Sequence, residues 1–238
     1  MGFRGKAERL RRRGSIKGGA LIGAIVLLSP SAIHSPARTS PESLPPTCNG
    51  TWTVVPSPNP TQQSALLQDV VAVSANDAWA VGNYSNSDGV FLTLAEHWDG
   101  SSWSIVSTPN VGSVYDQLYG VSALGSDDVW AVGSTEGPSG RIHTLAEHWD
   151  GVSWTVVPTP PTPNQATSLA GVNVISPANV WAVGKTTTRG SSHRLRIRYT
   201  TGTLIEHWDG HAWSIVPNPM SGAVLAELWS VSDRKSVV

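Results

Sequence analysis

The stretch Val129-Trp-Ala-Val-Gly133 decides the fold of this chain, because it returns at a fixed distance along the sequence. Close copies lie 51 residues before and after it, at 78–82 and 180–184, and a second phrase, Glu-His-Trp-Asp-Gly, follows each copy. The recurring tryptophans are Trp79, Trp130, Trp181, Trp98, Trp149, Trp208, Trp103, Trp154 and Trp213. A block that returns at this period predicts a tandem array of one supersecondary unit.

Each unit contains four short apolar segments. In the second unit they are 118–124, 129–133, 142–149 and 153–157, each rich in β-branched or aromatic residues and bounded by turn residues. The pair Asp150-Gly151 between the last two predicts a tight hairpin, since glycine accepts a positive φ. Four antiparallel strands repeated in tandem are typical of a β-propeller blade. We therefore predict an all-β propeller of four-stranded antiparallel blades, with about three complete blades and partial strands at both ends.

The internal spacings locate the one irregular unit. Tryptophan precedes a leucine by 15 residues four times, from Trp52 to Leu67 through Trp213 to Leu228. The distance from Trp79 to Trp98 is 19 residues in the first unit, and the second unit repeats it, but the third unit has 27. The third unit therefore carries eight additional residues between its second and third strands.

That insertion holds four of the eight basic residues that follow position 38. We predict a ligand-contacting loop on the propeller rim for an acidic polysaccharide or a protein, and the alternative is a solvated extended hairpin. The residues in question are Arg189, His193, Arg194, Arg196 and Arg198.

The charge distribution bears on partners and location. Residues 1–38 hold eight basic side chains against Glu8 alone, which leaves eight basic and sixteen acidic residues in the rest. A body this acidic disfavours nucleic acid, which requires a basic surface. The apolar run 20–28 follows the basic segment and has the length of a secretory signal, which predicts a secreted or cell-surface protein. The alternative is an uncleaved N-terminal anchor, which would be the chain's one contact with a membrane.

The predicted organisation follows from these patterns: a signal peptide or signal anchor over 1–37, a proline-rich linker over 38–48, repeats over 49–232 and a non-repeat tail over 233–238. Val231 still fits the register, but charged Asp233 and Arg234 stand where two apolar residues are expected. We interpret the tail as the product of a truncated reading frame, and the alternative is a natural C-terminal cap. Propellers close with about four to eight blades, so the chain is expected to be a fragment.

Both repeated phrases resemble those of exported bacterial repeat proteins, mostly uncharacterised, of the Kelch or galactose-oxidase central-domain propeller type. The resemblance covers roughly 49–232 and implies a propeller fold. Paired glycines expected of Kelch repeats after the second strand are absent. Asp99-Gly-x-x-Trp103 is also similar to the Asp-box of sialidase-like propellers but lacks one residue between Asp and Gly, so that geometry is not assumed.

The repeated polar residues favour structural roles. The recurring Glu-His pairs lie a whole blade apart, which prevents three histidines from converging on one metal ion, so we expect them to bond neighbouring backbone or an adjacent blade. The second-strand tryptophans are expected to pack between sheets. Asp77, Asp128 and Asn179 are expected to satisfy turn donors. No motif for a catalytic site, a metal or a cofactor is found.

The sequence thus predicts a non-catalytic, extracytoplasmic binding or scaffold module that presents loops to a protein or glycan ligand. The alternative is a fragment of a propeller-fold glycan-active enzyme, sialidase- or lyase-like, whose catalytic residues would lie in further blades.

Overall fold

The computed structural model describes residues 51, 53–61, 63–112, 114–190, 199–218 and 225–233. The chain divides into two units at Thr51, and every described strand belongs to the second, Trp52–Val238. The predicted signal segment and linker, 1–37 and 38–48, lie outside the described residues.

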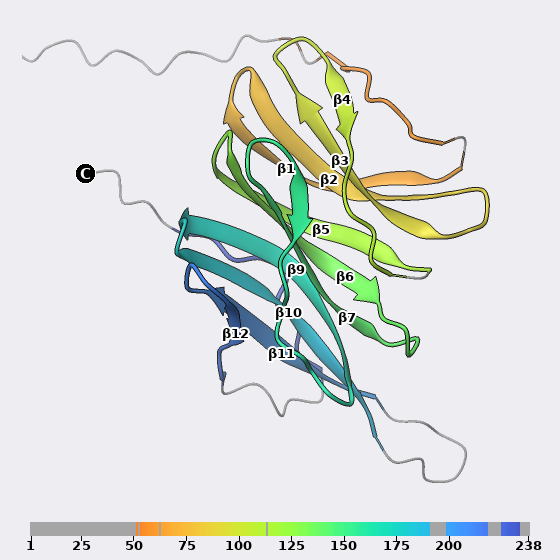
Figure 1. The fold of residues 1–238 in the computed structure, drawn as a ribbon, viewed down its shortest axis with the longest axis vertical. Helices are drawn as coiled ribbons and strands as arrows, with labels where there is room; N and C mark the ends of the chain where they lie inside the picture. Colours follow the sequence, from red (N-terminus) through yellow and green to blue (C-terminus); the bar gives the residue numbers. More distant parts are fainter. Residues whose placement is uncertain are drawn as a thin grey trace, which may run out of the picture. The chain divides into compact units, whose positions relative to one another are not determined.

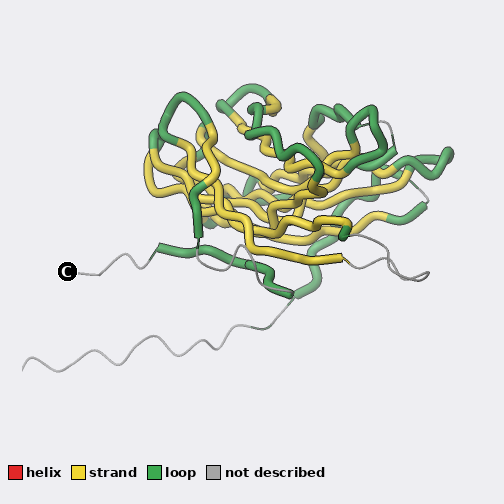
Figure 2. The backbone as a smooth tube through the Cα atoms, turned by 90° about the horizontal axis from the view of Figure 1, so that it is seen from below, coloured by secondary structure: helices red, strands yellow, loops and turns green. Residues whose placement is uncertain are grey.

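The described residues form three sheets of four strands each, and no described residue is helical (Figure 2). The first sheet contains β1 (Ala65–Ser74), β2 (Asp77–Ser85), β3 (Phe91–Trp98) and β4 (Trp103–Val106). The second contains β5 (Asp116–Gly125), β6 (Asp128–Glu136), β7 (Ile142–Trp149) and β8 (Trp154–Val156). The third contains β9 (Gln165–Ser176), β10 (Asn179–Arg189), β11 (Tyr199–Trp208) and β12 (Trp213–Ile215).

Within each sheet the strands pair antiparallel in chain order, so each sheet is a four-stranded blade. The four segments predicted for the second unit correspond to β5–β8, and the predicted β-propeller architecture with about three blades is confirmed. The third and fourth strands meet at Asp-Gly hairpins, where Gly100, Gly151 and Gly210 have φ of 94°, 92° and 95°. Positive φ is the conformation that the sequence predicted for Gly151.

The three blades follow one another through their first strands, since β1 contacts β5 and β5 contacts β9 (Figure 1). Residues 225–233 continue the series beside the third blade, where Leu228 N–H donates to Gly184 O at 3.3 Å. The apolar side chains of neighbouring blades form two buried clusters, one centred on Trp79 and the other on Trp130.

The antiparallel order gives each blade two ends with different connections. At what we call the turn end, short turns join the first strand to the second and the third to the fourth, at 75–76, 99–102 and their equivalents. At the loop end lie the links from second to third strand and the segments that join one blade to the next. The eight-residue insertion falls at the loop end of the third blade, where β10 and β11 extend to an Arg189–Tyr199 pair.

Candidate binding site

The first strand of every blade is irregular at the same point. In β1 the pairing with β2 shifts between Leu67 and Asp69, which leaves Gln68 as a bulge. The equivalent bulges are Tyr119 in β5 and Ala170 in β9. A bulge bends its strand and re-aims a side chain, and such features recur near binding sites.

The glycine that ends the repeated Trp-Ala-Val-Gly phrase is required by this bulge. A Cβ atom on Gly82 would lie 1.9 Å from Leu66 O, one on Gly133 1.9 Å from Gln117 O, and one on Gly184 2.0 Å from Ser168 O. Only a residue without a side chain permits such a close approach of two backbones.

Residue 229 continues the series of bulge positions. Trp229 follows Leu228 as Gln68, Tyr119 and Ala170 follow their leucines. Its carbonyl lies against Gly171 as that of Ala170 lies against Gly120, with 2.9 Å from each carbonyl oxygen to a Cβ placed on the glycine. The same backbone position thus carries a different residue in each successive unit: Gln, Tyr, Ala and Trp. The bulge itself does not require this variation.

These bulge positions line one hollow of about 550 Å³. Its remaining wall comes from β1, β9, β10 and the segment 225–233. The residues with functional side chains in this lining are Gln68, Asp69, Tyr119, Ser168, Lys185, Glu227, Trp229 and Ser230. A concave site with a few polar groups and an aromatic ring is a typical ligand site.

Several side chains of the hollow already have internal partners, among them the Tyr119 hydroxyl, which donates to Gln117 Oε1 at 2.8 Å. Lys185 Nζ lies 3.2 Å from Glu227 Oε1 and 5.8 Å from the centroid of the Trp229 ring. Asp69 Oδ2 accepts a hydrogen bond of 3.0 Å from Val121 N–H, which ties β1 to β5. Trp229 itself is 71% exposed.

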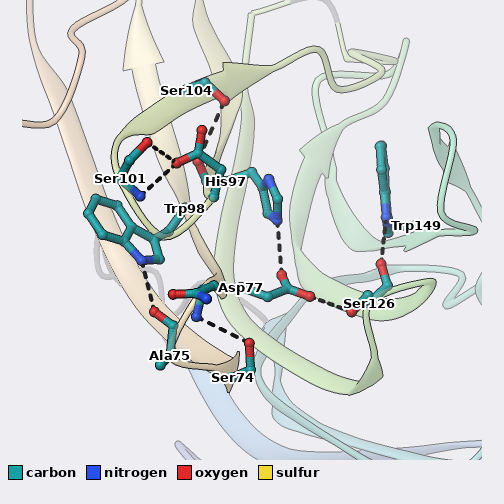
Figure 3. Close-up of polar contacts among 11 residues, drawn as sticks. Ser74, Ala75, Asp77, His97, Trp98, Ser101, Ser104, Ser126 and Trp149 are labelled. Atoms are coloured by element: carbon teal, nitrogen blue, oxygen red, sulfur yellow. Dashed lines mark hydrogen bonds and ion pairs between the residues drawn. The ribbon is translucent and has the colours of Figure 1, made fainter.

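The turn end has a different character, because its side chains are bonded to one another. Asp77 Oδ1 lies 2.9 Å from His97 Nε2, and Asp77 Oδ2 accepts a hydrogen bond from Ser126 of the second blade (Figure 3). The Trp149 indole N–H donates to Ser126 O at 3.1 Å. Burial opposes ionisation of Asp77, but the bonds from Ser126 and His97 outweigh it and lower the pKa of its carboxyl.

The histidine bond recurs in the other blades, with 2.9 Å from His148 to Asp128 and 2.9 Å from His207 to Asn179. Two sequence-based expectations were therefore wrong in detail. The histidines bond a side chain of their own blade, and the Asx residues accept from histidine, because the second and third strands place both side chains on one face.

The second-strand tryptophans pack between blades where a following blade exists. Trp79 is 1% exposed, with its ring centroid 4.8 Å from that of Trp149 and 5.3 Å from that of Trp154. Trp130 is 2% exposed and meets Trp208 and Trp213 at 5.2 and 5.4 Å. The expected packing between sheets is therefore observed for these two rings.

The corresponding rings at the two outer faces have fewer neighbours. Trp181 is half-buried, and its ring contacts His207 at 4.4 Å. Trp98 and Trp103, also half-buried, have ring centroids 5.8 Å apart across their hairpin. Between blades, a second-strand tryptophan packs on two hairpin tryptophans of the next blade. Each outer face presents only one side of this arrangement.

The repeated glutamates are all buried. Glu96 accepts a hydrogen bond of 2.7 Å from Ser57. Glu147 is 0% exposed, and neither carboxyl oxygen has a hydrogen-bond partner among the described residues. Burial raises the pKa of Glu147 to about 8, with a further contribution from the charge of Asp116, and burial raises that of Glu206 to about 7.

The predicted arginine loop is described only at its base. Arg189 is exposed at the end of β10, whereas His193, Arg194, Arg196 and Arg198 lie outside the described residues. The sequence reasoning missed the hollow, although a signal was present: the residue after the leucine of each 15-residue spacing varies, while that leucine and the valine three positions after it repeat.

The described part of the chain contains neither a candidate metal site nor a candidate membrane-spanning helix. No three His, Cys, Asp or Glu side chains there are placed to hold a metal ion. No helix in the same part is long and apolar enough to span a membrane.

No protein-family model matches the chain, and no curated protein is similar to it. Among solved structures, the chain is similar to YCF48 bound to a D1 peptide, with 15% identity and a TM-score of 0.41 over 71% of this chain. That match spans 47% of the YCF48 chain, about half its length. It is also similar to a fucose lectin from Kordia zhangzhouensis in complex with methyl-fucoside, with 13% identity, a TM-score of 0.39, and coverage of 63% of this chain and 96% of the lectin.

Proposed function

We propose that this chain is a non-catalytic binding module that engages a protein or glycan ligand at the loop end of its blades. The observation that carries the proposal is the contrast between the ends. The same His–Asx bond of 2.9 Å recurs in all three blades at the turn end, whereas the links from second to third strand at the loop end differ in sequence and, in the third blade, in length. Variable residues on a repeated scaffold are the usual arrangement of a binding surface.

A binding role is favoured over catalysis by the burial of the two carboxyls with the most raised pKa. A general acid must reach the leaving group of its substrate. Glu147 and Glu206 are both 0% exposed, out of reach of a glycan. The glycan-active alternative therefore needs a general acid other than these two buried glutamates.

A glycan array and a displayed peptide library, both probed with the purified full chain, test this proposal. We expect selective binding to members of one library, with no change in ligand mass by mass spectrometry after prolonged incubation. Cleavage of a bound glycan would establish the enzymatic alternative, and binding to neither library would overturn the proposal.

The location is part of the same proposal. The basic segment and apolar run before residue 38 support export to the cell surface or beyond, and the acidic composition of the rest argues against nucleic acid as the partner. Fractionation of the native host with an antibody to the repeats tests export. Detection in the cytoplasmic fraction alone would contradict it.

The arginine-containing insertion remains a proposed second contact for acidic ligands, supported by the exposure of Arg189 at its base. Replacing Arg194, Arg196 and Arg198 with serine is expected to weaken binding to acidic glycans on the array. Unchanged binding by this variant would leave the insertion as a solvated hairpin.

A further inference from the structure

The hollow lined by the bulge residues has a composition that selects among ligand classes. Its acids and its base largely neutralise one another, since Lys185 Nζ lies 3.2 Å from Glu227 Oε1. The other carboxylate, Asp69, is held by the Val121 N–H. With two carboxylates and one ammonium group in its wall, the hollow carries no excess positive charge to attract an anion.

A cationic ligand fits poorly for a different reason. The ring of Trp229 is the strongest cation-binding surface in the hollow, but Lys185 Nζ already approaches it to 5.8 Å from the centroid. A ligand ammonium at the same ring would meet the charge of that lysine at short range. The hollow therefore disfavours quaternary amines and basic peptide side chains.

What remains is an exposed aromatic ring surrounded by groups that both donate and accept hydrogen bonds. Trp229 is 71% exposed, which leaves ring surface open to a ligand. The amide of Gln68 and the hydroxyl of Ser168 each offer a donor and an acceptor, while the pair Lys185–Glu227 adds a charged donor and a charged acceptor. Such a set suits a molecule with one flat C–H face and several hydroxyl groups.

We propose that this hollow binds one neutral sugar residue, whose C–H face stacks on Trp229 and whose hydroxyls bond Gln68, Ser168 and the Lys185–Glu227 pair. The inference rests on the proposed binding function and narrows it to a site and a ligand class. It also accounts for the variation of the bulge residues, since each blade contributes a different side chain to the same wall.

The experiment uses the full chain and a panel of neutral methyl glycosides of glucose, galactose and mannose. Binding is followed by NMR titration of the tryptophan indole N–H signals, with the Trp229 signal assigned from its loss in Trp229→Ala. We expect one glycoside to shift this signal saturably. We expect Trp229→Ala to weaken affinity at least about tenfold, which corresponds to ~1.4 kcal/mol, and Gln68→Ala to weaken it severalfold.

Trp98→Ala is the matched control, because Trp98 is a partly exposed tryptophan at the turn end, where its indole N–H donates to Ala75 O at 3.1 Å. It should leave sugar affinity unchanged, and thermal unfolding of each variant checks that the fold is retained. Full affinity in Trp229→Ala would place the sugar elsewhere and overturn the inference while sustaining the proposed function. Binding of library peptides but of no glycoside would likewise overturn the sugar site and sustain the proposed binding function. The absence of all binding would overturn the sugar site and the binding function together.

Discussion

The two ends of the blades differ in how closely they repeat from one blade to the next. At the turn end, three blades repeat one arrangement: a histidine Nε2 lies 2.9 Å from an Asx Oδ1, and a tryptophan N–H donates to a turn carbonyl at 3.1 to 3.2 Å. At the loop end the corresponding links read Asn86-Ser-Asp-Gly-Val90 and Gly137-Pro-Ser-Gly-Arg141, and in the third blade eight additional residues lengthen both the link and the two strands that it joins.

The backbone explains part of this difference. The first two loop-end links share the same backbone hydrogen bonds, with Asn86 N–H donating to Val90 O at 3.0 Å and Gly137 N–H to Arg141 O at 2.9 Å. Their side chains nevertheless differ, apart from the glycine that both links share, Gly89 and Gly140. The comparison teaches that the turn end repeats one set of side-chain bonds within each blade, whereas the loop-end links vary in sequence and length.

The largest effect on stability is expected when an indole ring that packs between two blades is removed. We expect Trp130→Ala to lower the free energy of unfolding by ~3–5 kcal/mol, because the ring is 2% exposed and packs on Trp208 and Trp213. Trp181→Ala, at the same position on an outer face, should lower the free energy of unfolding by a smaller amount. Trp229→Ala, near the loop end, should change it by no more than about 0.5 kcal/mol. Urea unfolding of the three variants measures these values.

Equal losses for Trp130 and Trp229 would break the distinction, since they would show that the hollow stabilises the fold as much as the packing between blades does. A loss at Trp181 as large as that at Trp130 would indicate that the outer face is covered in solution, for example by another chain.

The second test concerns the buried carboxyl of Glu147. In the folded state it keeps its proton up to about pH 8, whereas the unfolded chain releases that proton near the ordinary value of 4.5. The folded state therefore binds more protons between these values, and stability falls as pH rises through this window. Glu147→Gln should therefore make the free energy of unfolding less dependent on pH. It should also raise that free energy at pH 8 by an amount on the order of a few kcal/mol.

Thermal unfolding between pH 4 and pH 9 measures this effect. Glu136→Gln, at the loop-end terminus of β6, is the control and should keep the pH dependence of the unmodified protein. The proposed burial of an uncompensated carboxyl would be wrong if Glu147→Gln followed the same curve as that control.

The sequence was sufficient to predict the blades because the repeat displays the same apolar positions three times. The 15- and 19-residue spacings located each strand, and the 27-residue spacing located the longer β10–β11 hairpin. The His97–Asp77 bond was missed because its partners are 20 residues apart, on strands whose register no spacing reveals. The hollow was missed for a related reason: Gln68, Tyr119 and Trp229 share a wall only once the bulge and the order of the blades are known.

The smallest effect is expected for a single hydrogen bond of the turn end. His148→Ala removes the partner of Asp128 and should lower the free energy of unfolding by ~1 kcal/mol, the usual net contribution of one such bond. The same substitution at His143, which is half-buried in the same strand but at the loop end, should change it by less than about 0.5 kcal/mol. Both histidines lie on β7, so strand propensity and chain position are matched, and the difference between the variants isolates the end of the blade. If His143→Ala proved the more destabilising, the uniform bonds of the turn end would not be what holds the blades in register, and the loop end would have to share that role.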